Sequence, residues 1–143
     1  MTTIQILCDA PDLIPVRATA KAAAFDLRAA HDADILHGQT TLIKTGVRIA
    51  LPEGYVGKIC SRSGLALKEG VFVVNAPGII DEDYRGEIGV ILGKFTPGGF
   101  HVARGQRIAQ LLIEKIPPVQ FEIVSELPET ERGENGFGST GTR

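Results

Sequence analysis

Short apolar stretches separated by turn residues run along most of the chain, and few show the period of an amphipathic helix. Each stretch is rich in Val and Ile, which favour strands, and most are bounded by Gly or Pro, as at Pro52, Pro97 and Gly105. This pattern is typical of an all-β protein and predicts a jelly-roll-like β-barrel or sandwich. The expected strands occupy residues 4–8, 40–51, 55–60, 71–74, 88–95, 108–116 and 121–124.

Two parts of the chain depart from the strand pattern. Residues 63–70 predict one short helix that stops near Gly70. From Pro128 onward the sequence is rich in Gly and poor in large apolar side chains, so this tail cannot build a core of its own. We therefore expect one β domain over residues 1–127 and a Gly-rich C-terminal arm over residues 128–143 that is mobile when alone.

Composition limits the functional classes that are open to this protein. The 143 residues are 43% hydrophobic, carry a formal net charge of −2 and have a mean hydropathy of +0.10. These values suit one domain with a core and favour neither general nucleic-acid binding nor membrane binding. We expect no membrane span and no signal peptide. Cys8 and Cys60 match no paired motif and are interpreted as reduced core residues of a cytoplasmic protein.

The densest polar cluster lies in residues 75–87, between two apolar stretches. Three successive acidic residues from Asp81 are followed directly by a tyrosine and an arginine, and nearby glycines leave main chain accessible to a ligand. We expect a tight hairpin turn between residues 71–74 and 88–92. A polar cluster held between strands that favour burial indicates a site rather than a surface loop.

Three further segments could carry chemistry, although each also has an ordinary structural explanation. Asp26, within residues 23–27, is on its own better explained as a turn-capping acid beside a strand. Arg62 and the two residues after it place a guanidinium, a hydroxyl and a Gly N–H at the start of the expected helix, where anions bind. A capped helix with a surface arginine explains them equally well. Gln110, in the polar turn at 105–110, is on its own best explained as part of an ordinary hairpin.

The tail has the glycine spacing of a phosphate loop without its other residues. Gly133 and Gly138 fit the spacing, but no Lys follows Gly138, which rejects a Walker A loop. The bare N–H groups, two hydroxyls and Arg132 still suit phosphate oxygens, and Phe137 suits stacking on a planar ligand. The alternative is a disordered Gly-rich end. A metal site in the His and Asp residues of 31–37 fits no standard motif and is disfavoured.

Taken together and in this order, five segments resemble the five motifs of the trimeric deoxyuridine triphosphatases (dUTPases). The third and fifth motifs are specific, whereas the first and fourth would mean little alone. In one departure, the first motif usually has Gly where this chain has Ala24, and alanine does not easily adopt a positive φ. We therefore expect the backbone or the water shell near Asp26 to differ from the family pattern. The segments are residues 23–27, 62–66, 78–86, 105–110 and 132–141.

The resemblance implies a homotrimer of jelly-roll subunits, with active sites at the subunit interfaces and each C-terminal arm closing a neighbour's site. It implies hydrolysis of dUTP to dUMP and pyrophosphate by attack of water on the α-phosphorus, which limits uracil in DNA and supplies dUMP for thymidylate synthesis. Asp81 would be the general base that deprotonates the water. Mg²⁺, held mainly by the phosphates, would contact Asp26 through water. Asp83 would be structural, facing Arg85 or another subunit.

The resemblance also assigns substrate contacts. Main chain in residues 78–81 and near Gly89 would read uracil, Tyr84 would leave no room for a ribose 2′-hydroxyl, and Phe137 would cap the base. The phosphates would be held by the first helix and the tail. The predicted substrate-binding residues are Arg62, Ser63, Gly64, Asn75, Gly78, Ile79, Ile80, Tyr84, Gly89, Gln110, Arg132, Phe137, Gly138, Ser139 and Thr140.

Two other functions stay open on the sequence. A dCTP deaminase has a related fold but usually a longer chain and a Glu as catalytic base, whereas this chain has the full Gly-rich fifth motif with Phe137. A non-catalytic β protein that keeps the nucleotide site as a switch is the second alternative. The presence of Asp81 argues against such an inactive site.

Overall fold

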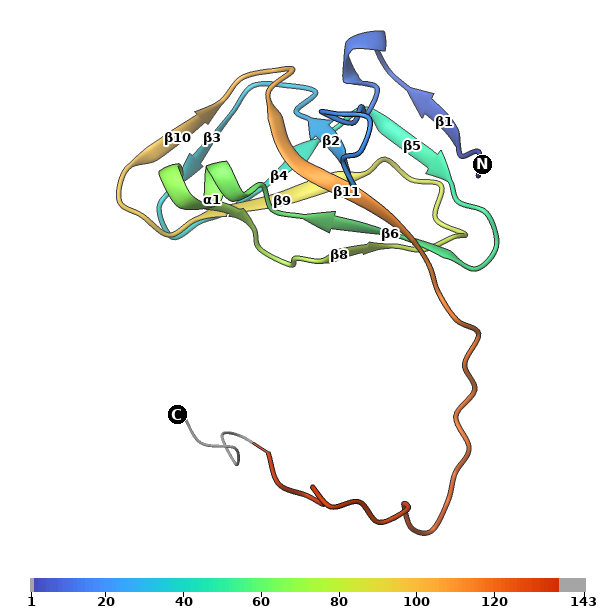
Figure 1. The fold of residues 1–143 in the computed structure, drawn as a ribbon. Coiled ribbons are helices and arrows are strands. Elements are labelled where there is room, and N and C mark those ends of the chain that lie inside the picture. Colours follow the sequence, from blue (N-terminus) through green and yellow to red (C-terminus); the bar gives the residue numbers. More distant parts are fainter. Residues whose placement is uncertain (1, 137–143) are drawn as a thin grey trace.

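Strands are the main secondary structure of the folded body, and each pair of named strands is antiparallel (Figure 1). The computed structural model describes residues 2–136 of the chain. The described residues form eleven strands, one short α-helix and one 3-10 helix, which confirms the predicted all-β class. The strands are β1 (Gln5–Cys8), β2 (Phe25–Arg28), β3 (Ala33–Leu36), β4 (Thr40–Lys44), β5 (Val47–Ala50), β6 (Tyr55–Cys60), β7 (Val71–Val73), β8 (Gly78–Ile80), β9 (Gly89–Lys94), β10 (Gly99–Val102) and β11 (Arg107–Lys115). The helices are η1 (Pro11–Leu13) and α1 (Ser63–Glu69).

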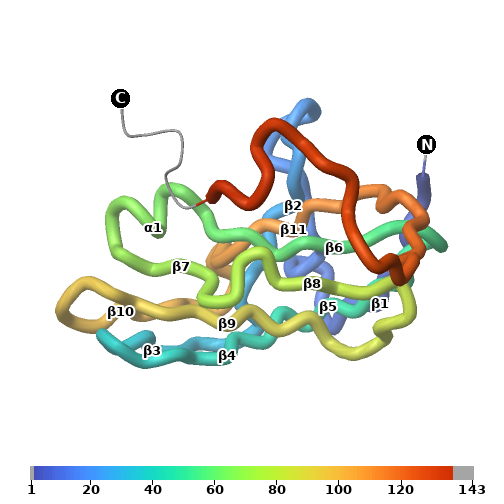
Figure 2. Tube along the Cα trace, turned by 90° about the horizontal axis from the view of Figure 1, so that it is seen from below, coloured from blue at the N-terminus to red at the C-terminus, as the bar shows by residue number. Residues whose placement is uncertain are grey.

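The strands pair into four sheets. The largest has the order β2-β11-β6-β8, the second has the order β4-β9-β7, and β1-β5 and β10-β3 form two smaller pairs. The two larger sheets lie in separate layers around a common core and do not close into a barrel (Figure 2). The result is a jelly-roll-like sandwich, as predicted. Strand β11 lies between β2 and β6, so the last strand sits inside the largest sheet.

Alternation along the strands explains how the core forms. In β9, Val90 and Leu92 are fully buried, whereas Ile91 between them is 36% exposed. In β5, Val47 and Ile49 are buried in the same way. Successive side chains of a strand point to opposite faces, so every second residue of these strands enters the space between the sheets. Each buried aliphatic side chain stabilises the fold by about 1.5–3 kcal/mol.

Three strand assignments from the sequence need correction. The stretch 40–51 divides into β4 and β5 at Gly46, which has a φ of 70° that favours glycine. Strands β3 and β10, which pair with each other, were not predicted because polar residues such as Asp34 interrupt their apolar pattern. The strand expected at 121–124 is wrong: these residues are exposed and pair with no strand among residues 2–136.

Helix α1 agrees with the expected helix and is fixed at its C-terminal end. Gly70 adopts the left-handed conformation there, with φ 64° and ψ 22°. Lys94 of β9 is only 6% exposed and donates a hydrogen bond from Nζ to the main-chain oxygen of Glu69 at 2.6 Å. A cation at this end also interacts favourably with the helix dipole. The sheet therefore fixes the helix that carries Ser63 and Gly64.

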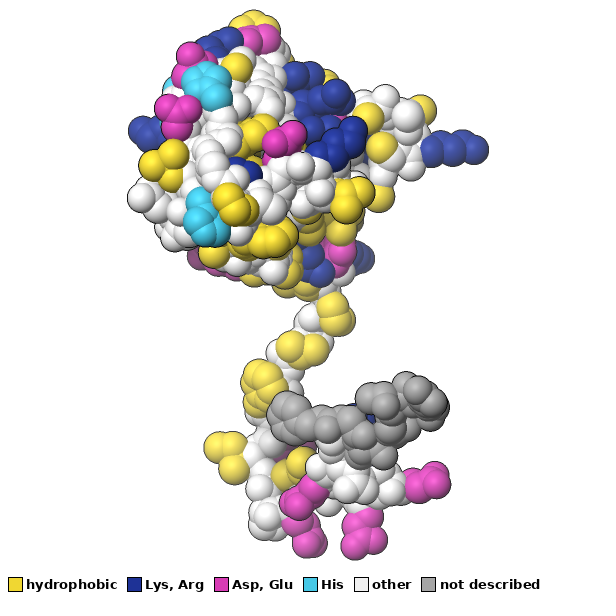
Figure 3. All heavy atoms as spheres, turned by 90° about the vertical axis from the view of Figure 1, so that its left-hand side faces the viewer, with side chains coloured by type: hydrophobic (Ala, Val, Ile, Leu, Met, Phe, Trp, Pro, Cys, Tyr) yellow, Lys and Arg dark blue, Asp and Glu magenta, His cyan; other side chains and the backbone are white. Residues whose placement is uncertain are grey.

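Residues 116–136 leave the body as an extended arm (Figures 1 and 3). The main-chain N–H of Ile116 donates to the oxygen of Gly54 at 2.8 Å, and among the described residues those from 117 onward make hydrogen bonds only with one another. Large apolar side chains on the arm face solvent, with Phe121 96% and Ile123 100% exposed. The domain boundary expected after residue 127 stays a prediction. Within residues 2–136, no helix is long and apolar enough to cross a membrane.

Candidate active site

A buried carboxylate held between two guanidinium groups marks one end of the candidate site. Asp26 lies on β2 and is 9% exposed. Its Oδ1 lies 3.3 Å from Nε of Arg62, and its Oδ2 accepts a hydrogen bond from Nη1 of Arg107 at 3.4 Å. Burying a single charge is costly, and the opposite charges offset that cost. We name these three residues the Asp26–Arg62–Arg107 cluster.

Arg107 is a site residue that the sequence analysis missed. It begins β11, whose residue Gln110 lies opposite Asp26 of β2. Arg107 also accepts, through its main-chain oxygen, a hydrogen bond from Nη1 of Arg62 at 3.0 Å. The signal that could have found it is its place within the polar segment 105–110, directly before an apolar strand. The register between β2 and β11, which brings it to Asp26, is not visible in the sequence.

Gln110 supports the start of α1 through main chain rather than pointing freely to solvent. Its Nε2 donates to the main-chain oxygen of Ser61 at 2.8 Å, and the Ser61 hydroxyl accepts from the N–H of Val73 at 2.8 Å. These bonds fix the main chain just before Ser63 and Gly64. Both residues are exposed at the start of the helix. The structure therefore brings together four predicted phosphate-binding residues: Arg62, Ser63, Gly64 and Gln110.

A narrow slot of about 90 Å³ marks the other end of the candidate site, between β8 and β9. Strand β8 is the edge of its sheet and pairs only with β6, so its other edge presents main-chain groups without strand partners. Gly78 is required for close packing there, because a Cβ on it would lie 3.2 Å from Nδ2 of Asn75. Of the residues predicted to read the base, all but Asp81 line this slot: Asn75, Gly78, Ile79, Ile80 and Gly89.

The expected hairpin across residues 75–87 is wrong in one respect. Its two flanking stretches pair directly as β7 and β9, but the residues between them do not form a tight turn, since β8 intervenes and joins β6 in the other large sheet. The stretch therefore crosses from one layer of the sandwich to the other. This crossing creates the slot, because β8 and the first residues of β9 lie side by side without a hydrogen-bonded ladder between them.

The residues after β8 form a turn that carries the acidic cluster, which we name the 81–87 turn. Asp81 is exposed and lines a hollow together with Tyr55 and Ile116. The hydroxyl of Tyr84 donates to the main-chain oxygen of Glu87 at 3.0 Å, and its ring covers Gly86, where any Cβ would collide with it. The turn thus holds the aromatic ring in a defined place beside the exposed carboxylate.

One of the two arrangements expected for Asp83, a pairing with Arg85, is not found among the described residues. Nη1 of Arg85 instead donates to the main-chain oxygens of Glu82, at 2.6 Å, and Tyr84, at 3.0 Å. The alternative, that Asp83 faces another subunit, stays a prediction.

Within one chain, the described part of the arm makes no hydrogen bond to the slot, the 81–87 turn or the Asp26–Arg62–Arg107 cluster. Arg132 donates from Nε to the main-chain oxygen of Asn135 at 2.9 Å, within the arm itself. Phe137, Gly138, Ser139 and Thr140 lie outside the described residues. In the part of the chain that is described, no group of three or more His, Cys, Asp or Glu residues could hold a metal ion. One chain therefore supplies the two ends of the site, and the described part of its arm lies away from both.

The slot and the charged cluster lie on the same sheet, at β8 and at β2 and β11. Comparison with known proteins gives this arrangement a context. The dUTPase family matches residues 11–141 of the chain. The deoxyuridine 5′-triphosphate nucleotidohydrolase of Anaplasma marginale (strain St. Maries) is 49% identical over 131 residues, which cover 90% of this chain and 89% of that protein. The protein of the same name from Mus musculus is 46% identical over 127 residues, covering 89% of this chain and 77% of that protein.

A solved structure agrees with these sequence relatives. The Staphylococcus bacteriophage 80alpha dUTPase with dUPNHPP has a TM-score of 0.91 and 28% identity, and the likeness covers 99% of this chain and 100% of that one. The sequence match and the shared fold both extend over nearly all of the body that holds the slot and the charged cluster. This chain is therefore a member of the dUTPase family.

Proposed function

We propose that this protein hydrolyses dUTP to dUMP and pyrophosphate, by attack of water on the α-phosphorus. The observation that carries the proposal is that one sheet bears both a main-chain slot at β8 and a pair of guanidinium groups at Asp26. The slot suits a small planar base, and guanidinium groups suit phosphate oxygens. Membership of the dUTPase family supports the same substrate, since the relatives carry the name deoxyuridine 5′-triphosphate nucleotidohydrolase.

Base selection rests on the edge of β8 and on Asn75. A main-chain N–H and C=O in fixed register match the donor and acceptor pattern of uracil and mismatch that of cytosine, in which the two are exchanged. The small volume of the slot supports exclusion of the extra methyl group of thymine. Gly78, Ile79, Ile80 and Gly89 contribute main chain rather than side chains, so the fold itself sets this selection.

Tyr84 selects the sugar, and Asp81 activates the water. The Tyr84 ring is held over Gly86 by its bond to Glu87, and such a fixed aromatic surface supports exclusion of a ribose 2′-hydroxyl. Asp81 follows β8 directly and is exposed, so its carboxylate can reach a water beside the substrate. In this role it orients that water and takes its proton.

The phosphates are held at the start of α1 and at the Asp26–Arg62–Arg107 cluster. Arg62, Ser63, Gly64 and Gln110 contact the α- and β-phosphates, and Asp26 keeps Arg62 in place. Bound Mg²⁺ would neutralise charge that develops on the triphosphate. Asp26 would hold it through water, since both carboxylate oxygens already face guanidinium groups and no cluster of three acidic or imidazole ligands exists among the described residues.

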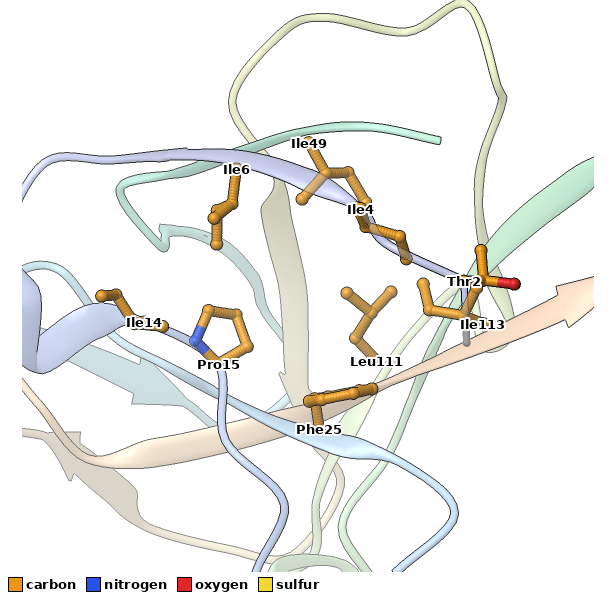
Figure 4. A pocket seen from close by; sticks show the side chains of 9 residues that line it. All are labelled: Thr2, Ile4, Ile6, Ile14, Pro15, Phe25, Ile49, Leu111 and Ile113. Atoms are coloured by element: carbon orange, nitrogen blue, oxygen red, sulfur yellow. The ribbon is translucent and has the colours of Figure 1, made fainter. Parts of the chain in front are cut away.

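Two exposed apolar surfaces support assembly into a homotrimer with shared active sites. One is the arm, where Val119, Phe121 and Ile123 are 79%, 96% and 100% exposed at alternate positions. The other is a groove of about 250 Å³ beside β1, lined by Ile4, Ile6, Ile14, Phe25 and Leu111 among others (Figure 4). Strand β1 has only β5 as a partner, so its other edge is open to an added strand. The arm of a second subunit fits this groove.

Exchange of arms also completes the site. An arm that crosses to a neighbour carries Arg132, Ser139 and Thr140 toward the γ-phosphate and Phe137 and Gly138 toward the base. Each arm then acts on a site other than its own, which agrees with closed cyclic symmetry. The free Cys8 and Cys60 support a reducing, cytoplasmic location.

Pyrophosphate release from dUTP, dTTP, dCTP and UTP tests the proposal, with Mg²⁺ present. We expect rapid release from dUTP and little from the other three. Ammonia release from dCTP would instead identify a deaminase. Binding of dUTP without release of pyrophosphate would identify a non-catalytic binder.

Asp81→Asn tests the assigned base. We expect it to keep dUTP binding and to lower turnover by roughly 10²-fold or more, because the general base is lost while the shape of the turn is kept. Near-normal turnover of this variant would remove Asp81 from the mechanism.

A further inference from the structure

The 81–87 turn is attached to the rest of the body by two glutamate carboxylates. Oε2 of Glu82 accepts a hydrogen bond from the N–H of Gly54 at 2.5 Å. Oε1 of Glu87 accepts one from the N–H of Gly46 at 2.8 Å. Gly46 immediately precedes β5, and Gly54 lies in the turn that follows it. The two carboxylates therefore fasten the turn at the two ends of one strand.

These bonds satisfy groups that the main chain leaves without partners. Gly46 and Gly54 have φ values of 70° and 74°, so both occupy left-handed turn positions. Neither N–H has a main-chain acceptor among the described residues. A buried N–H without a partner is costly, and a hydrogen bond to an ionised carboxylate is stronger than one between neutral groups. Both glutamates are half-buried, which limits competition from water.

The two ends of the turn differ in strength. Beside Glu87, the N–H of Ile88 donates to the oxygen of Val47 at 2.8 Å, and the hydroxyl of Thr45 donates to the oxygen of Ile88 at 2.6 Å. At the Glu82 end, its carboxylate makes the one hydrogen bond that the side chains of residues 81–83 form with the rest of the described chain. On its N-terminal side Asp81 is fixed by Ile80, which pairs with Gly57 of β6, so on its C-terminal side the attachment of Glu82 to the body sets its position.

Each attachment also has a different functional neighbour. Glu82 follows Asp81 directly, and both line the hollow at the start of the arm. The main-chain oxygen of Glu87 accepts the hydroxyl of Tyr84 at 3.0 Å. Moving Glu82 would therefore displace the carboxylate that faces water, whereas moving Glu87 would displace the aromatic ring.

We propose that Glu82 and Glu87 are positioning residues with separate effects: Glu82 fixes Asp81 for catalysis, and Glu87 fixes Tyr84 for sugar discrimination. The inference rests on the proposed function, because it assigns consequences to dUTP hydrolysis. Neither glutamate touches substrate in this scheme. Each acts through the turn it holds: Glu82 bonds to the N–H of Gly54, and Glu87 bonds to the N–H of Gly46 and lies 3.8 Å from Nη2 of Arg48 on β5.

Steady-state kinetics of Glu82 variants test the first half. Glu82→Ala should lower kcat for dUTP by about tenfold to a hundredfold and change KM by less than about threefold, because a small displacement of the base costs rate rather than affinity. Glu82→Gln keeps an oxygen acceptor for Gly54 and should stay within about threefold of the wild-type kcat. Glu53→Ala is the matched control, since it removes an exposed carboxylate from the same β5–β6 turn without removing an attachment.

Substrate discrimination by Glu87 variants tests the second half. Glu87→Ala should lower the ratio of kcat/KM for dUTP over UTP by about tenfold, because the Tyr84 ring loses its fixed place. Glu87→Gln should retain most of that ratio. Glu82→Ala should leave the ratio unchanged, which separates a positioning role from a general loss of structure.

Amide hydrogen exchange of the wild-type protein keeps the proposal testable if an alanine variant does not fold. The N–H groups of Gly46 and Gly54 should exchange at least about tenfold more slowly than in an unstructured peptide. Fast exchange at either glycine, or a folded Glu82→Ala variant with wild-type kcat, would overturn the inference. Failure of the proposed function would look different, since wild-type protein would then release no pyrophosphate from dUTP.

Discussion

The two ends of the candidate site are built from different parts of the polypeptide. The slot between β8 and β9 is bounded by main chain, glycine and aliphatic residues, with Asn75 as the one polar side chain lining it. The other end consists of charged side chains that meet at Asp26 from β2, β11 and the start of α1. Base selection is therefore a property of strand positions, whereas phosphate binding is a property of individual residues. Side-chain substitutions should therefore change phosphate binding far more easily than base selection.

Removal of residues 132–143 should have the largest effect and should act on the phosphate end. We expect a folded trimer whose kcat/KM for dUTP is lower by about 10²-fold or more, because the γ-phosphate loses Arg132, Ser139 and Thr140. The residual activity should still prefer dUTP to dCTP, since the slot lies on the body. Pyrophosphate release and gel filtration measure both points. Hydrolysis at the full rate would exclude a closing role for the arm.

Arg107→Ala should have the next largest effect. This substitution removes one of the two guanidinium groups that face Asp26, so Arg62 is held less firmly. We expect KM for dUTP to rise about tenfold, with the preference for the base unchanged. Thermal unfolding should show a lower midpoint as well. Lys58→Ala is the control, because it removes a cation from an exposed pair with Glu114 on the same sheet. Equal effects from both substitutions would mean that the cluster at Asp26 has no special role.

Gly78→Ala should produce a smaller effect that is confined to the base end. The added Cβ would lie 3.2 Å from Nδ2 of Asn75, so this amide must shift and the preference for dUTP over dCTP should fall by about threefold to tenfold. Gly89→Ala is the comparison within the same slot. Its Cβ would meet only the end of the Leu42 side chain, which is 60% exposed and free to move, so preference should be kept. A larger loss of preference in Gly89→Ala than in Gly78→Ala would mean that the base binds elsewhere.

The smallest effect should come from Asp12, which lies outside both ends. The hydrogen bonds from Arg104, at 2.6 and 3.1 Å, lower the pKa of the Asp12 carboxyl in the folded protein. The ion pair therefore stabilises the fold above the ordinary carboxyl pKa, and this contribution is lost as the pH falls toward the lowered value. Because both side chains are exposed, Asp12→Asn should lower the melting temperature at pH 7 by no more than about 4 °C. The difference should shrink as the pH falls from about 5 toward 2, as melting curves at several pH values would show.

The strands that the sequence predicted well are short stretches rich in Val and Ile that turn residues separate. The stretch 88–95 is one of them, and it contains β9, where Val90 and Leu92 are fully buried. Residues 121–124 are rich in apolar residues and have no partner strand among residues 2–136, so local pattern alone led to a wrong strand. The local apolar pattern shows that a segment is able to form a strand, whereas pairing depends on which other segment is available.

The candidate site was predictable where residue type decides the chemistry and unpredictable where register decides the contact. Asp26 was an acid among apolar residues, and Arg62 and Gln110 lay in polar segments that the family resemblance singled out; the structure brings the three together. Arg107 reaches Asp26 only through the pairing of β11 with β2, and Glu82 reaches Gly54 across 28 positions in the chain. Such contacts follow from the arrangement of strands, which a single sequence does not display.

The place of β11 between β2 and β6 also bears on how the protein is made. A ribosome releases this strand after the other described strands, and β2 and β6 are joined into one sheet only through β11. The largest sheet therefore cannot close while most of the chain is being synthesised, and its contacts span long sequence separations, which slows folding. Nascent chains must keep β2 and β6 from pairing wrongly in the meantime. The apolar arm emerges later still, when the body that it would otherwise disturb already has its full set of strands.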